Sequence, residues 1–149
     1  MSTYTHILYQ VVFTPKNRHP VLLKENRDLL YRFFGGVFVK RKCILHQVGG
    51  IEDHTHFIFF LHPSVALASL IRDLKVASNK FIKEECLFPD FEGWQIGYSA
   101  FTYHYEAKNN LINYVKNQET HHKKEPSLLE LKRLLKEHNV DYDDKYLSP

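Results

Sequence analysis

Two histidines separated by a single residue, His54 and His56, are well placed in this sequence to bind a cation together. They begin the apolar run HTHFIFFL (54–61), which is typical of a central strand covered on both faces. Residues two apart in a strand point to the same face, about 6.5–7 Å apart, so both imidazoles can reach one metal ion. Two ligands leave such a site incomplete, and ten histidines in 149 residues also allow this spacing to arise by chance.

A second pair, Tyr114 and Gln118, lies in the stretch LINYVKNQ (111–118). Four residues apart on a helix, the phenol and the amide share one face, although a tyrosine on an amphipathic helix is more often part of the core. A phenol is a poor nucleophile unaided, since with a pKa near 10 only about one molecule in a thousand is ionised at pH 7. Attack by Tyr114 therefore needs a cation or a base nearby.

Together the two pairs predict a metal-assisted reaction at phosphorus. A divalent cation held by His54 and His56, with the carbonyl oxygen of Gln118 as a third neutral ligand, would keep its full charge and leave coordination positions for phosphate oxygens. It would polarise the phosphate while Tyr114 attacks in line. Oxygen ligands and a phosphate substrate favour Mg²⁺ or Mn²⁺ over zinc.

The spacing of apolar residues and of turn residues predicts the elements that must position these side chains. In chain order they are a strand over 5–14, a helix over 22–39, a strand over 43–48 with Gly49 and Gly50 as its turn, a strand over 54–61, a helix over 64–85 capped by Ser64, a strand over 94–105, a helix over 107–120 and a last helix opened by the capping box Ser127-x-x-Glu130.

The first six elements follow the βαββαβ order of ferredoxin-like (RRM-like) domains. We therefore expect an α+β fold: a four-stranded antiparallel sheet with two helices on one face, followed by the helix that carries Tyr114 and by a C-terminal helix. This fold hosts many unrelated functions, so the fold alone does not decide the activity.

Length and composition indicate one globular unit. With 149 residues, 44% of them hydrophobic and 25% charged, we expect a single domain over 1–149, with a core over about 4–120 and a C-terminal helix and tail over about 121–149. The sequence shows neither a signal peptide nor about 18 consecutive apolar residues, so we expect a cytoplasmic protein. Cys43 and Cys86 lack a metal-binding spacing and are expected to be reduced.

Positive charge is concentrated at the N-terminal end. The whole chain carries +3, yet residues 1–42 contain eight basic and two acidic residues, which suits a polyanionic partner. Candidate DNA-phosphate contacts are a cluster after the first strand and two lysines on the helix that follows the histidine strand. They are Lys16, Arg18, His19, Lys75 and Lys80. For the two lysines, a solvated helix face is the simpler explanation.

Three segments resemble the single-tyrosine HUH transposases, the IS200-like group of the smallest insertion sequences. The run HTHFIFFL is similar to the histidine-hydrophobic-histidine strand that gives these enzymes their name, and LINYVKNQ resembles the helix bearing their nucleophile. The N-terminal YQVVFTPKNRHPVL (9–22) resembles their opening strand and its basic turn. The resemblance spans about Tyr4 to Gln118, with the three segments in the family's order.

The resemblance implies a transposase that recognises hairpins in single-stranded DNA at element ends, cleaves the strand through a 5′-phosphotyrosine and rejoins strands. It implies that Tyr114 is the nucleophile and that His54, His56 and Gln118 bind a divalent metal, Mg²⁺ or Mn²⁺. It also implies a bacterial or archaeal protein of the cytosol or nucleoid, acting as a homodimer in which the tyrosine helix of one protomer completes the partner's active site.

Two positions depart from the family's pattern. Thr55 fills the usually apolar middle place of the HUH signature, and because a strand residue points away from both neighbours, a packing change is expected rather than a loss of metal binding. Glu52-Asp53 stands where the family more often has Pro-Asp. Asp53 could orient one imidazole, or its carboxylate could cap the turn.

Two other functions fit the same residues. One is a ferredoxin-like nucleic-acid-binding protein without catalytic activity, such as a domesticated transposase, which the Glu52 departure and the modest net charge leave open. The other is a different single-tyrosine HUH nickase, of the replication-initiator or relaxase type. Small size and the absence of a helicase or origin-binding domain disfavour this second alternative.

Overall fold

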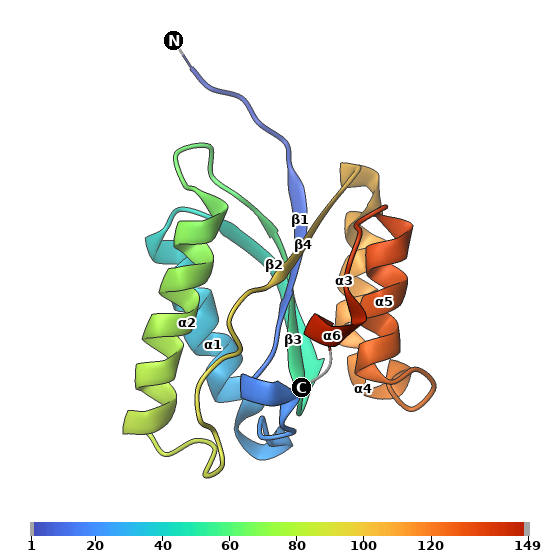
Figure 1. The fold of residues 1–149 in the computed structure, drawn as a ribbon. Coiled ribbons are helices and arrows are strands. Elements are labelled where there is room, and N and C mark those ends of the chain that lie inside the picture. Colours follow the sequence, from blue (N-terminus) through green and yellow to red (C-terminus); the bar gives the residue numbers. More distant parts are fainter. Residues whose placement is uncertain (1, 148–149) are drawn as a thin grey trace.

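The computed structural model describes residues 2–147 and contains a four-stranded antiparallel sheet flanked by helices (Figure 1). The strands are β1 (Leu8–Phe13), β2 (Ile44–Ile51), β3 (His54–Phe60) and β4 (Ser99–Tyr103), in the order β2-β3-β1-β4. The helices are α1 (Lys24–Lys40), α2 (Leu67–Glu84), α3 (Lys108–Lys116), α4 (Gln118–His121), α5 (Ser127–Glu137) and α6 (Asp144–Leu147), with short 3-10 helices η1 (Lys16–Arg18) and η2 (Tyr105–Ala107). The predicted α+β, ferredoxin-like fold is confirmed. None of the helices in the described part combines the length and hydropathy of a membrane span.

Helices cover both faces of the sheet. α1 and α2 lie on one face, whereas α3, α4 and α5 lie on the other (Figure 1). The larger hydrophobic core lies under α1 and α2, where Phe34 and Phe38 of α1 meet Phe57 of β3. On the opposite face, Leu8 and Ile58 form a smaller apolar cluster with the tyrosine helix α3. This face therefore has room for buried polar side chains.

Strand β3 is buried on both faces, which explains its lack of polar alternation. Phe57 and Phe59 join the core under α1 and α2, whereas His54 and His56 point to the other face, toward α4 and α5. By the alternation of the strand, Thr55 shares the face of Phe57, where it is fully buried. Its hydroxyl has no hydrogen-bond partner among the described residues. The departure at Thr55 is thus a matter of packing.

The predicted turn at Gly49 and Gly50 is wrong, because both glycines lie inside β2 and the turn falls at 52–53. A Cβ atom at Gly49 would come within 2.6 Å of the carbonyl oxygen of Val115, and one at Gly50 would overlap the carbonyl oxygen of His54. The glycines therefore permit a close approach of backbones. Gly49 lets α3 pack directly on β2, which sets the depth of the tyrosine helix, whereas Gly50 lets β2 approach the start of β3.

The predicted strand over 94–105 is shorter in the structure, where β4 begins at Ser99. The ammonium group of Lys75 donates to the carbonyl oxygens of Gln95 (2.8 Å) and Gly97 (2.6 Å), which holds this segment as a loop. Gly97 also has a φ of +91°, a conformation that ends an extended strand.

Two helices differ from their predicted form. α2 begins three residues after Ser64, whose hydroxyl bonds the ring of His62 (2.7 Å) and does not cap the helix. The predicted helix over 107–120 is interrupted at Asn117, which has a φ of −99° and a ψ of 20°. Gln118 is therefore the first residue of α4 and not the last turn of α3.

Candidate active site

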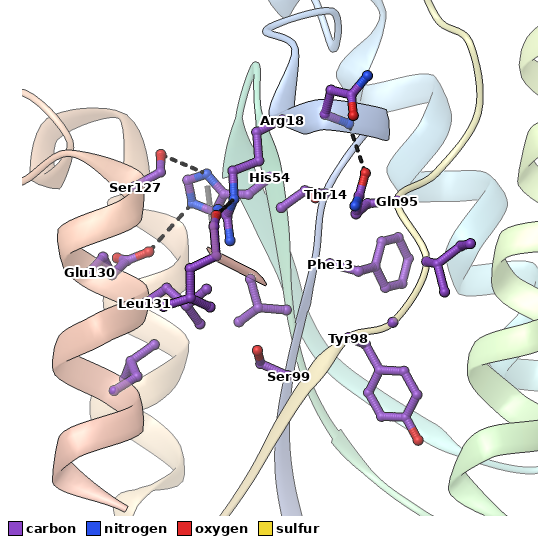
Figure 2. A pocket seen from close by; sticks show the side chains of 16 residues that line it. Phe13, Thr14, Arg18, His54, Gln95, Tyr98, Ser99, Ser127, Glu130 and Leu131 are labelled. Atoms are coloured by element: carbon purple, nitrogen blue, oxygen red, sulfur yellow. Dashed lines mark hydrogen bonds and ion pairs between the residues drawn. The ribbon is translucent and has the colours of Figure 1, made fainter. Parts of the chain in front are cut away.

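The predicted site residues lie between the sheet and the helices α3, α4 and α5. A pocket of about 260 Å³ opens beside them, between β1, the segment before β4, and α5. Figure 2 shows His54 at the α5 side of this pocket with Ser127 and Glu130, and Gln95 and Tyr98 on the opposite side. The pocket thus gives access to one edge of the histidine pair.

The four residues with predicted chemical roles come together in one cluster, and all four belong to one chain. Nε2 of His54 is 2.9 Å from Oε1 of Gln118. The ring of His56 lies perpendicular to the ring of Tyr114, with 5.8 Å between the ring centres. β3 places the histidines, α3 places the tyrosine and α4 places the glutamine.

Each histidine of β3 uses one ring nitrogen for a positioning partner and turns the other inward. Nδ1 of His54 donates to Oδ1 of Asp53 (2.8 Å), and Nδ1 of His56 donates to Oε1 of Gln10 (2.8 Å). Both partner atoms are acceptors, so Nδ1 carries the ring proton and Nε2 presents a lone pair. Gln10 is itself oriented, because its Nε2 donates to the hydroxyl of Tyr103 (2.6 Å). Asp53 and Gln10 therefore select the tautomer that suits metal binding.

Two residues that the sequence did not assign to the site complete the cluster: His122, which follows α4, and Glu130 of α5. Nδ1 of His122 donates to the carbonyl oxygen of Glu125 (2.6 Å), so Nε2 faces inward, 2.7 Å from Oε1 of Gln118. Oε1 of Glu130 lies 2.9 Å from Nε2 of His56 and 3.2 Å from Nε2 of His122. Three imidazoles and one carboxylate thus point at the same small volume.

Burial and hydrogen bonding set the charges in this cluster. Burial lowers the pKa of His56 to about 4, although the carboxylate of Glu130 opposes the shift, so this ring is neutral at pH 7. Burial also disfavours a charge on His122, but the bond to Glu130 raises the pKa of His122 overall. Burial opposes ionisation of Glu130 too, yet the adjacent imidazoles of His122 and His56 and the hydrogen bond from Tyr114 hold its pKa well below the usual range. Glu130 is therefore a buried carboxylate.

This donor set fits a divalent cation. Ligand atoms of His54, His56, His122 and Glu130 lie within 4.8 Å of one another, and Oε1 of Gln118 contacts two of the same imidazoles. Lone pairs that converge without protons between them repel, and a cation at their centre makes the same arrangement favourable. Mg²⁺ prefers oxygen ligands, so three imidazoles favour Mn²⁺ of the two predicted metals.

The hydroxyl of Tyr114 lies between the carboxylate of Glu130 and the guanidinium group of Arg133, both on α5. It donates to Oε2 of Glu130 and accepts from Nη2 of Arg133 (3.1 Å). Burial and the bond to Glu130 raise the pKa of Tyr114 far above its ordinary value, although Gln118 and Arg133 act in the opposite direction. The phenol is protonated in this state. One carboxylate therefore contacts both the imidazoles and the predicted nucleophile.

The predicted capping box of α5 is wrong. The hydroxyl of Ser127 donates to Oδ1 of Asp53 (2.8 Å), and Glu130 points into the cluster and not back toward residue 127. Burial opposes ionisation of Asp53, yet the bonds from His54 and Ser127 lower its pKa. These polar contacts dock the start of α5 against the turn that leads into β3.

A family model described as Transposase IS200 like matches residues 3–118. The chain belongs to the IS200-like transposase family. The matched segment contains both strand histidines, Tyr114 and Gln118, whereas α5 with Glu130 lies beyond its end. No curated protein matches this transposase significantly.

The IS200-like transposase shares its fold with two solved structures. One is described as a "putative transposase" from Deinococcus radiodurans R1, with 21% identity and a TM-score of 0.60, covering 79% of this chain and 95% of that one. The other is a REP-associated tyrosine transposase bound to a REP hairpin, with 16% identity and a TM-score of 0.60, covering 82% of this chain and 74% of that one. Both similarities concern the fold.

Three of the transposase's candidate phosphate contacts lie near the site. Arg18 of η1 lines the pocket beside His54, and its Nε donates to the carbonyl oxygen of Leu147 (3.1 Å). Lys16 and His19 are exposed in the same turn. This turn therefore presents basic groups at the rim of the pocket.

The two lysines of α2 have other surroundings. Lys75 holds the loop before β4, and its burial lowers its pKa. Lys80 is exposed and pairs with Glu84 (3.8 Å) one turn further along α2. Lys80 therefore lies on a solvated helix face, as the simpler explanation predicts, whereas Lys75 makes structural contacts that the sequence did not indicate.

The second departure from the family pattern, Glu52, does not point into the cluster. Its Oε1 lies 3.3 Å from Nη1 of the buried Arg27, which also bonds Glu119 of α4 at 2.7 Å. This pairing directs the acidic side chain toward α1. Glu52 therefore links the turn before β3 to α1 and α4.

Sequence reasoning missed several residues of the site. They are Gln10, His122, Glu130 and Arg133. Two of them left a signal: a glutamine interrupts the apolar strand 5–14, and His122 stands four residues after Gln118, on the same helical face. The other two belong to a helix whose sequence shows no sign of its position over the sheet.

Proposed function

We propose that this IS200-like transposase is a metal-dependent single-stranded DNA endonuclease and strand transferase. It recognises hairpins at element ends, cleaves DNA through a 5′-phosphotyrosine at Tyr114 and rejoins strands. The main support is one arrangement: the hydroxyl of Tyr114 and the inward nitrogens of His54 and His56 all meet the carboxylate of Glu130.

The metal would be held by His54, His56 and Gln118, with His122 and Glu130 as further ligands. When bound, a divalent cation, Mg²⁺ or Mn²⁺, supplies positive charge that polarises the scissile phosphate. The acceptors behind the two strand imidazoles keep their Nε2 lone pairs available for this purpose.

Tyr114 acts as the nucleophile. Its oxygen forms a bond to phosphorus while the bond from phosphorus to the 3′ oxygen breaks, which leaves a 3′-OH and a 5′-phosphotyrosine. The hydrogen bond to Oε2 of Glu130 gives the phenolic proton a path away from the nucleophile. In rejoining, a 3′-OH attacks the phosphotyrosine and the tyrosine oxygen leaves.

Hairpin DNA is the proposed partner. The basic turn with the exposed Lys16 and His19 and the half-buried Arg18 lies at the rim of the pocket and would contact phosphates. One protein of the same fold, the REP-associated tyrosine transposase, is bound to a REP hairpin. A transposase acting on chromosomal DNA would work in the cytoplasm.

One chain supplies every group of the proposed site, so we propose that catalysis occurs within a protomer. The homodimer implied by the family resemblance, in which the tyrosine helix of one protomer completes the partner's active site, stays a prediction. Our proposal of catalysis within a protomer is the alternative to this sharing of sites. Because α5 contributes Glu130, we also propose that the C-terminal helix acts with the rest of the chain as a single domain.

The test is the covalent adduct. The protein is incubated with Mn²⁺ and hairpin oligonucleotides taken from the DNA that flanks its gene, and products are separated on a denaturing gel. We expect a protein–DNA adduct that EDTA and Tyr114→Phe both abolish, whereas Tyr142→Phe, at an exposed tyrosine of the C-terminal segment, leaves it unchanged.

Two outcomes would favour the alternatives. Tight hairpin binding without any adduct would indicate a nucleic-acid-binding protein without catalytic activity. An adduct formed by a protein whose gene lacks subterminal palindromes on both sides would indicate a replication-initiator or relaxase type of nickase.

A further inference from the structure

Arg133 of α5 lies at the reacting oxygen of the proposed nucleophile. Its Nη2 donates to the hydroxyl oxygen of Tyr114 at 3.1 Å, and its guanidinium carbon lies 5.8 Å from the centre of the tyrosine ring. Arg133 stands three residues after Glu130, so both side chains project from one face of α5 toward Tyr114. The family match ends at residue 118 and assigns no role to this helix.

Two carboxylates hold the guanidinium group in place. Nε of Arg133 lies 3.2 Å from both carboxylate oxygens of Glu125, and Nη2 lies 3.1 Å from one of them. Nη1 donates to Glu137 at 3.0 Å. These bonds to Glu125 and Glu137 raise the pKa of Arg133, although partial burial acts against the charge. The positive charge is thus placed before any substrate arrives.

The guanidinium group suits this position in a way that an ammonium group would not. Its planar fork offers five N–H donors, so some bind Glu125 and Glu137 while another remains for the tyrosine oxygen. A lysine side chain is a single point charge and cannot make these three contacts in one plane.

We propose that Arg133 is a catalytic residue that stabilises negative charge on the oxygen of Tyr114. This inference rests on the proposed function. In cleavage, the oxygen of Tyr114 bonds to phosphorus as the phenolic proton leaves, and the departing 3′ oxygen takes up a proton. In rejoining, the bond between phosphorus and the tyrosine oxygen breaks, and this oxygen departs with the electron pair. Arg133 donates its hydrogen bond in both steps and keeps its own protons.

Such a contact acts on the rate more than on binding. A preorganised donor aimed at an oxygen that gains charge in the transition state is typically worth about 10²–10³ in rate. We therefore expect Arg133→Ala to slow single-turnover cleavage about 100-fold and to slow rejoining of the isolated adduct to a similar extent. Hairpin affinity should change no more than in Lys136→Ala, which removes one charge from an exposed position of the same helix.

The experiment measures three quantities in wild type, Arg133→Ala, Arg133→Lys and Lys136→Ala: hairpin affinity, cleavage rate and rejoining rate, all in Mn²⁺. Arg133→Lys is expected to fall between wild type and Arg133→Ala, because it keeps the charge and loses the fork. Added guanidinium ion should restore part of the rate of Arg133→Ala, whereas methylammonium should not. Purely structural damage would respond to neither ion.

Each outcome decides the proposal. If wild type forms an adduct and Arg133→Ala cleaves and rejoins at the wild-type rate, Arg133 has no catalytic role and the proposed function stands. If wild type forms no adduct, both fall together. If far-UV circular dichroism shows that Arg133→Ala is unfolded, Arg133→Lys is decisive, and a wild-type rate in that variant refutes the role of the fork.

Discussion

Gln10 gives the sharpest test of how the sheet prepares the metal site. This side chain is fully buried on β1, accepts the Nδ1 proton of His56 at 2.8 Å and donates to the Tyr103 hydroxyl at 2.6 Å. Gln10→Leu keeps the volume nearly constant and removes both contacts. The Nδ1 proton of the fully buried His56 is then without an acceptor, whereas the half-buried hydroxyl of Tyr103 lies closer to water.

The expected effects follow from these contacts. One unsatisfied buried donor costs about 1–3 kcal/mol of stability, which at about 2–4 °C per kcal/mol lowers the melting temperature by roughly 2–12 °C. Loss of the partner that orients a metal-ligating histidine typically weakens metal binding about 10–100-fold, or about 1.4–2.7 kcal/mol. Gln10→Glu keeps an acceptor for His56, so it should bind metal much better than Gln10→Leu.

Isothermal titration calorimetry with Mn²⁺ and differential scanning calorimetry measure the two effects. Gln47→Leu is the matched control, because it removes a strand glutamine whose side chain donates to the neighbouring carbonyl of Val48 at 3.1 Å and, within residues 2–147, has no hydrogen bond to a histidine. An Mn²⁺ affinity of Gln10→Leu within twofold of wild type would refute the positioning role. The absence of any Mn²⁺ binding by wild type would refute the metal site itself.

Three further predictions address the strand histidines, the neighbouring threonine and the nucleophile. An equimolar mixture of His56→Ala and Tyr114→Phe should show no cleavage, because the two side chains meet within one chain; recovered activity would instead show that protomers share their sites. Thr55→Val should raise the free energy of unfolding in urea by about 1 kcal/mol and leave adduct formation unchanged, because it removes a buried hydroxyl without a partner; a loss of stability would contradict this account. Since the pKa of His56 falls from 6.5 to about 4 on folding, the unfolded chain binds more protons between these pH values. Stability without metal should therefore fall as the pH drops from 6.5 toward 4, by at most roughly 3 kcal/mol for this residue, and His56→Asn should show a smaller fall in urea titrations at pH 7 and pH 4.5.

The fold was largely predictable because its strands carry strong local patterns. The alternation of Tyr9, Val11 and Phe13 matches the face of β1 that enters the larger core, and the continuous apolar run of β3 matches its burial on both sides. The glycine pair was misinterpreted for a physical reason. A glycine that permits a turn and a glycine that permits another backbone to approach look the same in one sequence. Here the backbone that approaches Gly49 is α3, more than 60 residues away, and the one that approaches Gly50 is the start of β3.

The candidate site was predictable where its residues share an element. Two histidines at strand spacing, and Tyr114 with Gln118 at helical spacing, have a relation that local geometry defines. Glu130 has no such spacing relation to the other site residues. The motif Ser127-x-x-Glu130 fits a capping box, but in the structure both side chains make tertiary contacts instead of capping the helix. Residues that reach a site from a separately packed helix are not encoded by spacing.

The position of Glu130 also changes the electrostatic argument for the metal. Neutral ligands were expected because a carboxylate cancels part of the charge that attracts a phosphate. The structure adds one carboxylate to the donor set, and it also places the guanidinium of Arg133 at the other side of the Tyr114 hydroxyl, 3.1 Å from its oxygen. Helix α5 therefore adds positive charge at the nucleophile through Arg133, and lowers the net positive charge at the metal site through Glu130. Since both side chains come from α5, the sheet, α3 and α4 alone would hold the predicted ligands and the nucleophile but neither of these charges.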